Sequence, residues 1–200
     1  MHPNPPMDAP AGKSGGGGTL LGRLISVDAT LSHHLHTITR PLLPYSLLLL
    51  LELSADFRLF FPISLSLLLS PTLLRPFLPP LLLGLLLDLA FVGLVKLFFR
   101  RPRPPHNNAS TMNVAVSVDH FSFPSGHASR VFFVASLAHL SAAAISDHEA
   151  VNYALFLVWV WAVLTSVSRV FLGRHFLSDV FAGACLGVLE ALFAFHFLRF

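Results

Sequence analysis

The chain has 200 residues, which is enough for one domain and rarely for two. Apolar residues make up 54% of it and Asp, Glu, Lys and Arg only 12%, whereas a soluble domain is typically about 25% charged. With a mean hydropathy of +0.70, this composition excludes disorder for most of the chain and argues against a water-soluble globule. It predicts a multi-pass membrane protein.

The amino-terminal region is expected to lie outside the membrane core. Residues 1–19 are rich in Pro and Gly and lack the apolar segment of a signal peptide, so we expect a disordered tail. Between residues 20 and 39 apolar side chains recur at helical spacing, with polar groups on the other face. This pattern predicts an amphipathic helix at the membrane interface. Residues 20–200 are expected to form one membrane-embedded domain.

Five hydrophobic segments predict an all-α, multi-pass transmembrane helical bundle of about five spans, each needing about 20 apolar residues. The first, 41–69, is interrupted by charges and predicts either one long tilted helix or a shorter span after a helix buried in the bundle. The remaining expected spans are residues 77–99, 127–146, 151–168 and 177–198. A loop with four prolines, 101–124, separates the second span from the third.

Five crossings place the 100–126 loop and the 169–176 turn on the same side of the membrane as the amino terminus. Three polar patterns lie in or beside these segments: Lys-x6-Arg-Pro from Lys96, Pro-Ser-Gly-His at 124–127, and Ser-Arg-x5-His-x3-Asp at 168–179. Each pattern alone is a weak signal, because a basic residue near the end of a span is usually an interface anchor.

Together the patterns predict a phosphate site. Lys96, Arg103 and Arg169 supply three cations, and arginine grips phosphate oxygens in a bidentate fork. Ser125 adds a hydroxyl, and Gly126 offers a backbone amide at the start of a helix, where anions are stabilised. The basic residues are therefore better explained as a phosphoryl clamp than as a nucleic-acid surface.

Two histidines and one carboxylate complete the predicted chemistry. His175 and Asp179 are four residues apart, so on a helix they share a face. The carboxylate is expected to accept the imidazole N–H and leave the other ring nitrogen as a nucleophile. His127 is expected on the same side, where it can protonate a leaving oxygen.

In this order the three patterns resemble the signature motifs of the type 2 phosphatidate phosphatase (lipid phosphate phosphatase) superfamily, over about residues 25–200. The strings LFFRRPRPPHN, SVDHFSFPSGHASR and SRVFLGRHFLSDV resemble its polyisoprenoid (presqualene) diphosphate phosphatase subgroup and plant lipid phosphate phosphatases of the beta type. The resemblance implies a metal-independent phosphohydrolase without cofactors, in which His175 forms a phosphohistidine, Asp179 is its partner and His127 is the acid. The phosphoryl ligands that it implies are Lys96, Arg103, Ser125, Gly126 and Arg169.

We therefore expect an integral membrane enzyme that hydrolyses polyisoprenoid diphosphates or related lipid phosphates in the bilayer. Phosphatidate, lysophosphatidate and sphingoid phosphates are the alternative substrates. A vanadate-dependent haloperoxidase shares the phosphate-site pattern, but such enzymes are expected to be soluble. A non-catalytic lipid-binding membrane protein would leave His175, Asp179 and His127 without a role.

Lysine and arginine counts in the short loops are higher on the side of the predicted site, which places that side in the cytosol. The endoplasmic reticulum is the expected compartment. Arg100, Arg101 and Arg174 flank the site and are expected to be solvated interface anchors, with recognition of a second phosphate or of anionic headgroups as the alternative.

Other polar residues are expected to be structural. Acidic residues within hydrophobic segments are costly and usually face the bundle interior, so structural hydrogen bonds are expected for Glu52, Asp88 and Glu190. His33 and His36 share a helical face, but we expect a polar face at the membrane edge there rather than a metal site.

Overall fold

The computed structural model describes residues 19–69, 77–107, 120–142 and 148–198. The described residues form helices and connecting segments, without strands, which confirms the predicted all-α bundle. The helices are α1 (Leu20–Thr39), α2 (Tyr45–Ser54), α3 (Phe57–Leu69), α4 (Leu78–Phe99), α5 (Gly126–Ala142), α6 (His148–Phe171) and α7 (Leu177–Phe197). The expected amino-terminal tail lies outside the described residues except for Thr19, whose hydroxyl caps α1 by accepting the Gly22 N–H at 3.2 Å.

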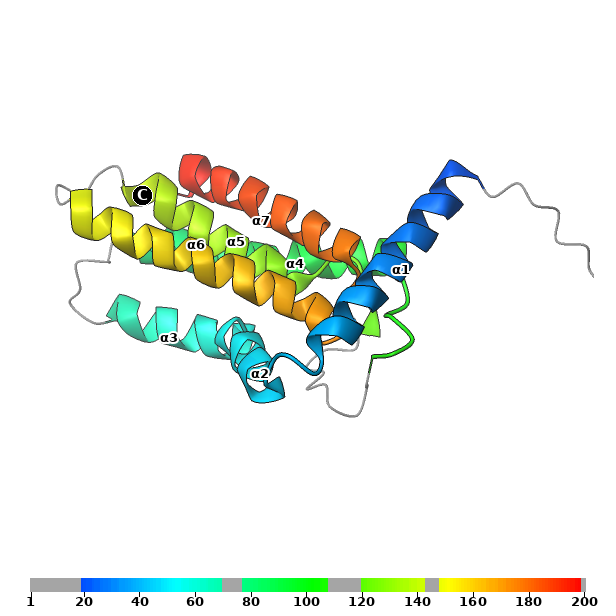
Figure 1. Cartoon of the computed structure of the whole chain (residues 1–200). Helices are drawn as coiled ribbons and strands as arrows, with labels where there is room; N and C mark the ends of the chain where they lie inside the picture. Colours follow the sequence, from blue (N-terminus) through cyan, green and yellow to red (C-terminus); the bar gives the residue numbers. More distant parts are fainter. Residues whose placement is uncertain (1–18, 70–76, 108–119, 143–147, 199–200) are drawn as a thin grey trace, which may run out of the picture.

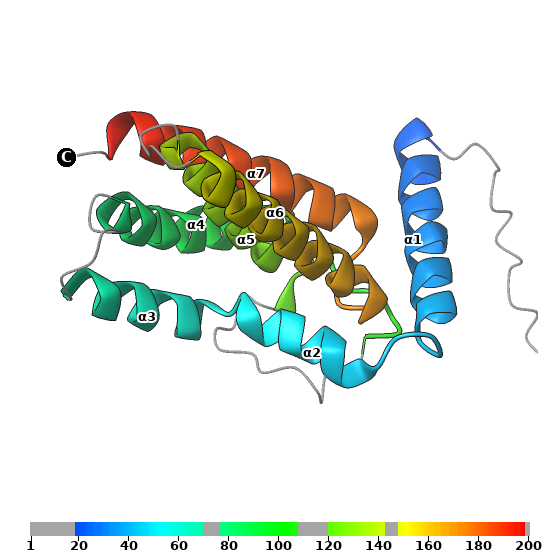
Figure 2. The ribbon, with the colours of Figure 1, turned by 60° about the vertical axis from the view of Figure 1, so that its left-hand side comes forward.

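Helices α3 to α7 lie side by side and alternate in direction, and α1 crosses one end of this bundle (Figures 1 and 2). Helix α5 is central, because it packs against α4, α6 and α7. Its Phe133 and Leu137 are fully buried against Leu85 of α4 and Ala191 of α7. Helix α5 thus packs both on its neighbour in sequence, α4, and on α7, which follows it only after α6.

Glycines bring the backbones of α5 and α7 into direct contact. A Cβ atom on Gly187 would lie 2.0 Å from the carbonyl oxygen of Ser129, and one on Gly183 would lie 2.4 Å from that of Ser125. Side chains at these two positions would force the helices apart. The residues at the start of α5 are therefore held directly against α7.

Among the described residues, α4, α7 and residues 149–171 of α6 are long and apolar enough to cross a membrane. These helices confirm the second, fourth and fifth expected spans, although α6 begins and ends three residues beyond its expected bounds. Helix α5 begins at Gly126, one residue before its expected start, and residues 143–146 of the expected third span lie outside the described residues. Its 17 described residues include the buried polar side chains of Ser129, Arg130 and Ser136.

The first hydrophobic segment is not one long tilted helix. It breaks after α2, where the Asp56 carboxylate accepts the Arg58 N–H at 2.9 Å and opens a new helix, α3. The alternative prediction was a shorter span after a helix buried in the bundle. The break into two helices agrees with it, but α2 buries only Leu48 and is therefore not a buried helix. The 13 residues of α3 extend about 20 Å, less than the roughly 30 Å of a hydrocarbon core.

Helix α1 turns its polar face toward the protein and its apolar face outward. Its apolar side chains, including Leu21, Leu24 and Leu31, are exposed, whereas Ser32 is buried against the bundle end. The polar face therefore binds the protein and the apolar face points outward, as expected of a helix that lies at a lipid interface.

Four polar side chains form a buried group in the middle of the bundle, which we call the mid-bundle cluster: Asp88, Ser129, Arg130 and Glu190. Arg130 forms a 3.1 Å ion pair with Asp88 and donates to the Ala55 carbonyl at 2.9 Å. The Ser129 hydroxyl lies 3.5 Å from a Glu190 carboxylate oxygen. The structural hydrogen bonds expected for both acids are confirmed.

Candidate functional site

The three sequence patterns meet at the end of the bundle that α1 crosses. The carboxyl end of α4, the amino end of α5 and the turn between α6 and α7 all lie there (Figure 1). This arrangement confirms that the two polar loops and the amino-terminal helix share one side. We call the charged residues gathered there the end cluster: Glu52, Lys96, Arg103, Arg169, Arg174 and His175.

The α6–α7 turn positions the last part of this cluster. Gly173 has a φ of +70°, and a Cβ atom there would lie 2.7 Å from a ring carbon of His106. The backbone N–H groups of Arg174 and His175 both donate to the Arg169 carbonyl, at 2.9 and 3.3 Å. This tight turn requires glycine and places His175, only 2% exposed, immediately before α7.

The imidazole of His175 is fixed in one tautomer. Its Nδ1 lies 2.7 Å from the Ser122 carbonyl oxygen, and because a carbonyl only accepts, Nδ1 carries the proton. The lone pair is then on Nε2, which faces the Arg103 guanidinium at 3.4 Å. Burial, followed by the positive charges of Arg103, Arg169 and Lys96, lowers the pKa of His175 well below 6.5, although the Ser122 hydrogen bond opposes the shift. His175 is therefore neutral at pH 7, as a nucleophile must be.

Asp179 does not hold the His175 ring as expected. Its Oδ2 lies 3.7 Å from Nδ1, beyond hydrogen-bond range, and accepts the Phe176 N–H at 2.9 Å instead. The expectation assumed that both residues lie on one helix, whereas α7 begins only at Leu177. His175 thus precedes the helix, and the carboxylate satisfies a free backbone amide at the helix start.

The predicted cations converge on His175. Arg103 donates to the Arg174 carbonyl at 2.8 Å as well as facing the imidazole. Lys96 and Arg169 are each only 2% exposed, and both lower the pKa of His175. Of the three cations predicted to form a clamp, Arg103 therefore faces the ring nitrogen, and Lys96 and Arg169 lie near enough to act on the imidazole electrostatically.

The Pro-Ser-Gly-His pattern forms the start of α5. Ser125 is fully buried, its N–H donates to the Asp179 carbonyl at 2.9 Å, and its hydroxyl lies 3.4 Å from the Ala128 amide. Gly126 is the first residue of the helix. His127 follows, and its buried Nε2 has no hydrogen-bond partner among the described residues. The predicted second histidine therefore has a nitrogen available to a ligand.

Sequence reasoning missed the connection between α1 and the site. Arg101 forms ion pairs with Asp28 of α1 at 2.8 Å and with Asp179 at 2.7 Å, and its guanidinium stacks 4.0 Å from the Phe176 ring centroid. Arg101 is therefore not a solvated anchor. The missed signal is the polar row at four-residue spacing on α1: Asp28, Ser32 and His36.

Each member of this row contacts the bundle end. Asp28 accepts the Ser178 N–H at 3.1 Å, and the Ser32 hydroxyl accepts the Leu177 N–H at 2.9 Å. Nδ1 of His36 lies 2.6 Å from the Phe171 carbonyl. The row thus binds two amides at the start of α7 and a carbonyl at the end of α6, and orients α1 across the site.

Arg174 also differs from expectation. It is 2% exposed and its guanidinium lies 3.5 Å from a Glu52 carboxylate oxygen, so it is not a solvated anchor. The same Glu52 oxygen lies 3.2 Å from Arg169. Arg100, in contrast, is exposed at the end of α4, as predicted. The structural hydrogen bond expected for Glu52 is not seen at this oxygen among the described residues. Glu52 instead forms ion pairs with two arginines of the site.

Histidines 33 and 36 share a face of α1, as expected. Their rings pack on His106, with centroids 4.9 and 4.7 Å apart. No group of three or more His, Cys, Asp or Glu among the described residues has an arrangement that could hold a metal ion. These rings therefore join α1 to the segment after α4.

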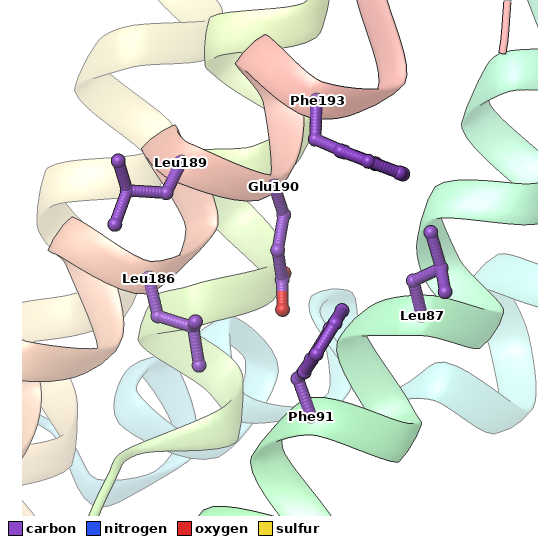
Figure 3. A pocket seen from close by; sticks show the side chains of 6 residues that line it. All are labelled: Leu87, Phe91, Leu186, Leu189, Glu190 and Phe193. Carbon is purple, nitrogen blue, oxygen red and sulfur yellow. The ribbon is translucent and has the colours of Figure 1, made fainter. Parts of the chain in front are cut away.

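An apolar pocket of about 190 Å³ lies between α4 and α7, with a Glu190 oxygen pointing into it (Figure 3). One of its lining residues, Phe91, precedes Lys96 of the end cluster by five residues on α4. The lining residues are Leu87, Phe91, Leu186, Leu189, Glu190 and Phe193.

Comparison with known proteins agrees with this geometry. A model of the PAP2 superfamily matches residues 77–200. The chain is 54% identical over 199 residues to the probable lipid phosphate phosphatase beta of Arabidopsis thaliana, covering 90% of this chain and 92% of that protein.

Two solved structures share the fold. One is a transmembrane PAP2-type phosphatidylglycerolphosphate phosphatase from Bacillus subtilis, with a TM-score of 0.68 and 24% identity over 88% of this chain and 86% of that one. The other is LpxE of Aquifex aeolicus, with a TM-score of 0.59 and 21% identity over 84% and 96% of the two chains. The extent of the family match, together with the Arabidopsis relative, shows that this membrane-helix bundle belongs to the PAP2 superfamily, as its three motifs predicted.

Proposed function

We propose that the chain is an integral membrane lipid phosphate phosphatase in which His175 is the nucleophile. The observation that carries this proposal is the fixed tautomer: the Ser122 carbonyl holds Nδ1–H, and the Nε2 lone pair faces the Arg103 guanidinium. A nucleophile that is neutral and surrounded by phosphate-binding charges suits attack on phosphorus. The name of the Arabidopsis relative supports the substrate class.

The chemistry requires two displacements at phosphorus. Nε2 of His175 attacks, the bond between phosphorus and the oxygen of the leaving group breaks, and a phosphohistidine forms. The leaving group is the lipid alcohol for a monophosphate and the lipid monophosphate for a diphosphate. Lys96, Arg103 and Arg169 stabilise the charge on the phosphoryl oxygens, together with the Ser125 hydroxyl and the Gly126 amide.

His127 donates the proton that the leaving lipid oxygen needs, because the negative charge of a bound phosphate favours its protonated form. A water molecule then attacks the phosphohistidine and gives a proton to His127, and inorganic phosphate leaves. Asp179 acts as a positioning residue in this scheme, since it holds the start of α7 behind His175.

We propose polyisoprenoid diphosphates as the leading substrates, with phosphatidate and sphingoid phosphates as alternatives. The sequence strings around all three motifs support this choice. An amphiphilic substrate also suits a site at one end of a bundle of apolar helices, because its head can reach the cations while its chain stays among lipids. One panel assay decides: farnesyl, geranylgeranyl and presqualene diphosphates against phosphatidate and sphingosine phosphate.

Replacing the nucleophile tests the mechanism. His175→Ala is expected to abolish phosphate release from every lipid in the panel while the protein stays folded in detergent. His34→Ala is the matched control, because His34 is exposed on α1. With radiolabelled substrate, the wild type should yield an acid-labile, alkali-stable phosphoprotein that His175→Ala lacks.

Retained activity in His175→Ala would contradict the assignment. The assays are run in EDTA, where phosphate release is expected to persist. A wild-type protein that binds these lipids but releases no phosphate would show a non-catalytic lipid-binding protein instead.

We also propose that the site faces the cytosol from the endoplasmic reticulum membrane, on the basis of the Lys and Arg distribution. A glycosylation tag placed before α1 is expected to stay unmodified, because α1 shares the side of the site. A glycosylated tag would place the site in the lumen.

A further inference from the structure

Glu52 places a carboxylate oxygen between two buried arginines. The same oxygen lies 3.2 Å from Arg169 and 3.5 Å from Arg174, and both arginines are only 2% exposed. An anion therefore already occupies a position that two guanidinium groups share. Phosphate oxygens and carboxylates are interchangeable partners for arginine, because both accept its N–H groups.

This anion position adjoins the proposed reaction centre. Arg169 lies close enough to His175 to lower its pKa. Arg174 is the residue immediately before His175, and its carbonyl accepts from the same Arg103 nitrogen that faces the His175 ring. The Arg174 guanidinium shares the Glu52 oxygen with Arg169. A second phosphate attached to one bound by Arg169 would thus find a further cation next to it.

Glu52 is placed so that it can give up this position. Its side chain is 21% exposed, unlike those of its two arginine partners. It lies in the last turn of α2, a helix of ten residues that ends at the break before α3. Withdrawal of the carboxylate requires only rotation of a flexible side chain.

We propose that Arg174 binds the second phosphate of a lipid diphosphate, and that Glu52 occupies this subsite until the substrate displaces it. The inference rests on the proposed function, that His175 attacks lipid phosphates. In such a substrate Nε2 forms a bond to the terminal phosphorus, the bond from that phosphorus to the bridging oxygen breaks, and a lipid monophosphate leaves with this oxygen. Arg174 then stabilises the leaving phosphate, whereas a lipid monophosphate has no group to place there.

The test compares kcat/KM for farnesyl diphosphate with kcat/KM for farnesyl monophosphate in the full chain in detergent micelles. Arg174→Gln is expected to lower the ratio of the two values about 10- to 100-fold, as loss of a hydrogen bond between charged groups predicts. Arg100→Gln is the matched control and should leave the ratio unchanged, because Arg100 is exposed.

Glu52→Gln tests the displacement separately. Without the competing carboxylate, KM for the diphosphate is expected to fall about three- to tenfold more than KM for the monophosphate. The double variant Glu52→Gln with Arg174→Gln removes one charge of each sign, so it remains informative if Arg174→Gln alone unfolds. It should show the same lowered ratio.

Equal losses for both substrates in the folded Arg174 variants would overturn the inference and assign Arg174 a structural role. Wild-type activity on both substrates in these variants would also leave the ratio unchanged and would overturn the inference as well. Failure of the proposed function looks different, because the wild type would then release phosphate from neither substrate.

Discussion

The end cluster and the mid-bundle cluster both bury charge inside an apolar bundle, but they are built from different parts of the chain. The mid-bundle cluster draws its side chains from the interiors of α4, α5 and α7, where Arg130 pairs with Asp88 and with the Ala55 carbonyl. The end cluster is built from helix ends and the segments between them, and backbone carbonyls hold its key groups in place.

The two clusters show that buried charge in this fold is stabilised differently in helix interiors and at helix ends. Carbonyls inside a helix are already paired within it, so Arg130 relies on Asp88 and on the Ala55 carbonyl at the end of α2. At the bundle end, loop carbonyls fix one nitrogen of His175 and leave the other facing the cations. The first arrangement stabilises the fold, and the second prepares for a ligand.

Breaking the mid-bundle pair is expected to give the largest effect on stability. Asp88→Ala leaves the Arg130 guanidinium buried without its carboxylate and should destabilise the protein by about 3–5 kcal/mol. Thermal unfolding in detergent measures the loss. Asp88→Leu combined with Arg130→Leu removes both charges and should recover most of it.

Activity per folded molecule should stay near that of the wild type in the double variant. A catalytic loss at full stability would contradict the distinction between the two clusters.

The contact between α5 and α7 supports both clusters and is tested next. Gly187→Ala places a methyl group against the Ser129 carbonyl and should destabilise the protein by about 1–3 kcal/mol. Gly93→Ala is the matched control, because nothing lies within 4 Å of a Cβ atom there. It should be neutral or slightly stabilising, since alanine favours the helix. Equal thermal stabilities would argue against direct backbone contact.

Acidification should destabilise the end cluster in particular. The folded state lowers the pKa of His175 below 6.5, so below that pH the unfolded chain binds a proton that the folded chain does not. Stability contributed by neutral His175 is therefore lost as pH falls, by at most about 1.4 kcal/mol per pH unit. Between pH 6.5 and 5, His175→Gln should show a shallower decline in unfolding temperature than the wild type. Parallel declines would contradict the lowered pKa.

The smallest predicted loss of stability comes from weakening the ion pairs of two aspartates, Asp28 and Asp56. Asp28→Asn weakens the bond from α1 to Arg101 and should cost about 1 kcal/mol, because its side chain is only 14% exposed. Asp56→Asn affects the more exposed pair with Arg58, where about 0–1 kcal/mol is expected. Phosphatase activity should fall in Asp28→Asn and persist in Asp56→Asn, since only the first change loosens Asp179. The reverse order would separate α1 from the site.

Periodicity and motif spacing predicted most of the fold and the membership of the site. The apolar runs predicted α4 and α7 to within one residue and α6 to within three, because long helices in lipid carry a strong hydropathy signal. Loop parity alone also predicts that Lys96 and His175 lie on one side.

The remaining contacts depend on tertiary packing that spacing does not encode. The break at Asp56 arises from one side-chain cap. His175 was expected to bond Asp179 but bonds the Ser122 carbonyl, because α7 starts after the histidine. Asp28 and Glu52 escaped notice as site residues because their partners lie far along the chain.

The glycine contact between α5 and α7 also sets the precision of the site. Gly183 lies against the Ser125 carbonyl itself, so main-chain atoms define the separation of the two helices at the start of α5. Side chains can change rotamer, whereas two backbones that leave no space for a Cβ atom between them have little room to shift. The spacing between the start of α5 and the start of α7 is therefore buffered against thermal fluctuation and against the varied lipids around the protein. The protein itself therefore fixes this distance between helices, since the surrounding lipid does not constrain it.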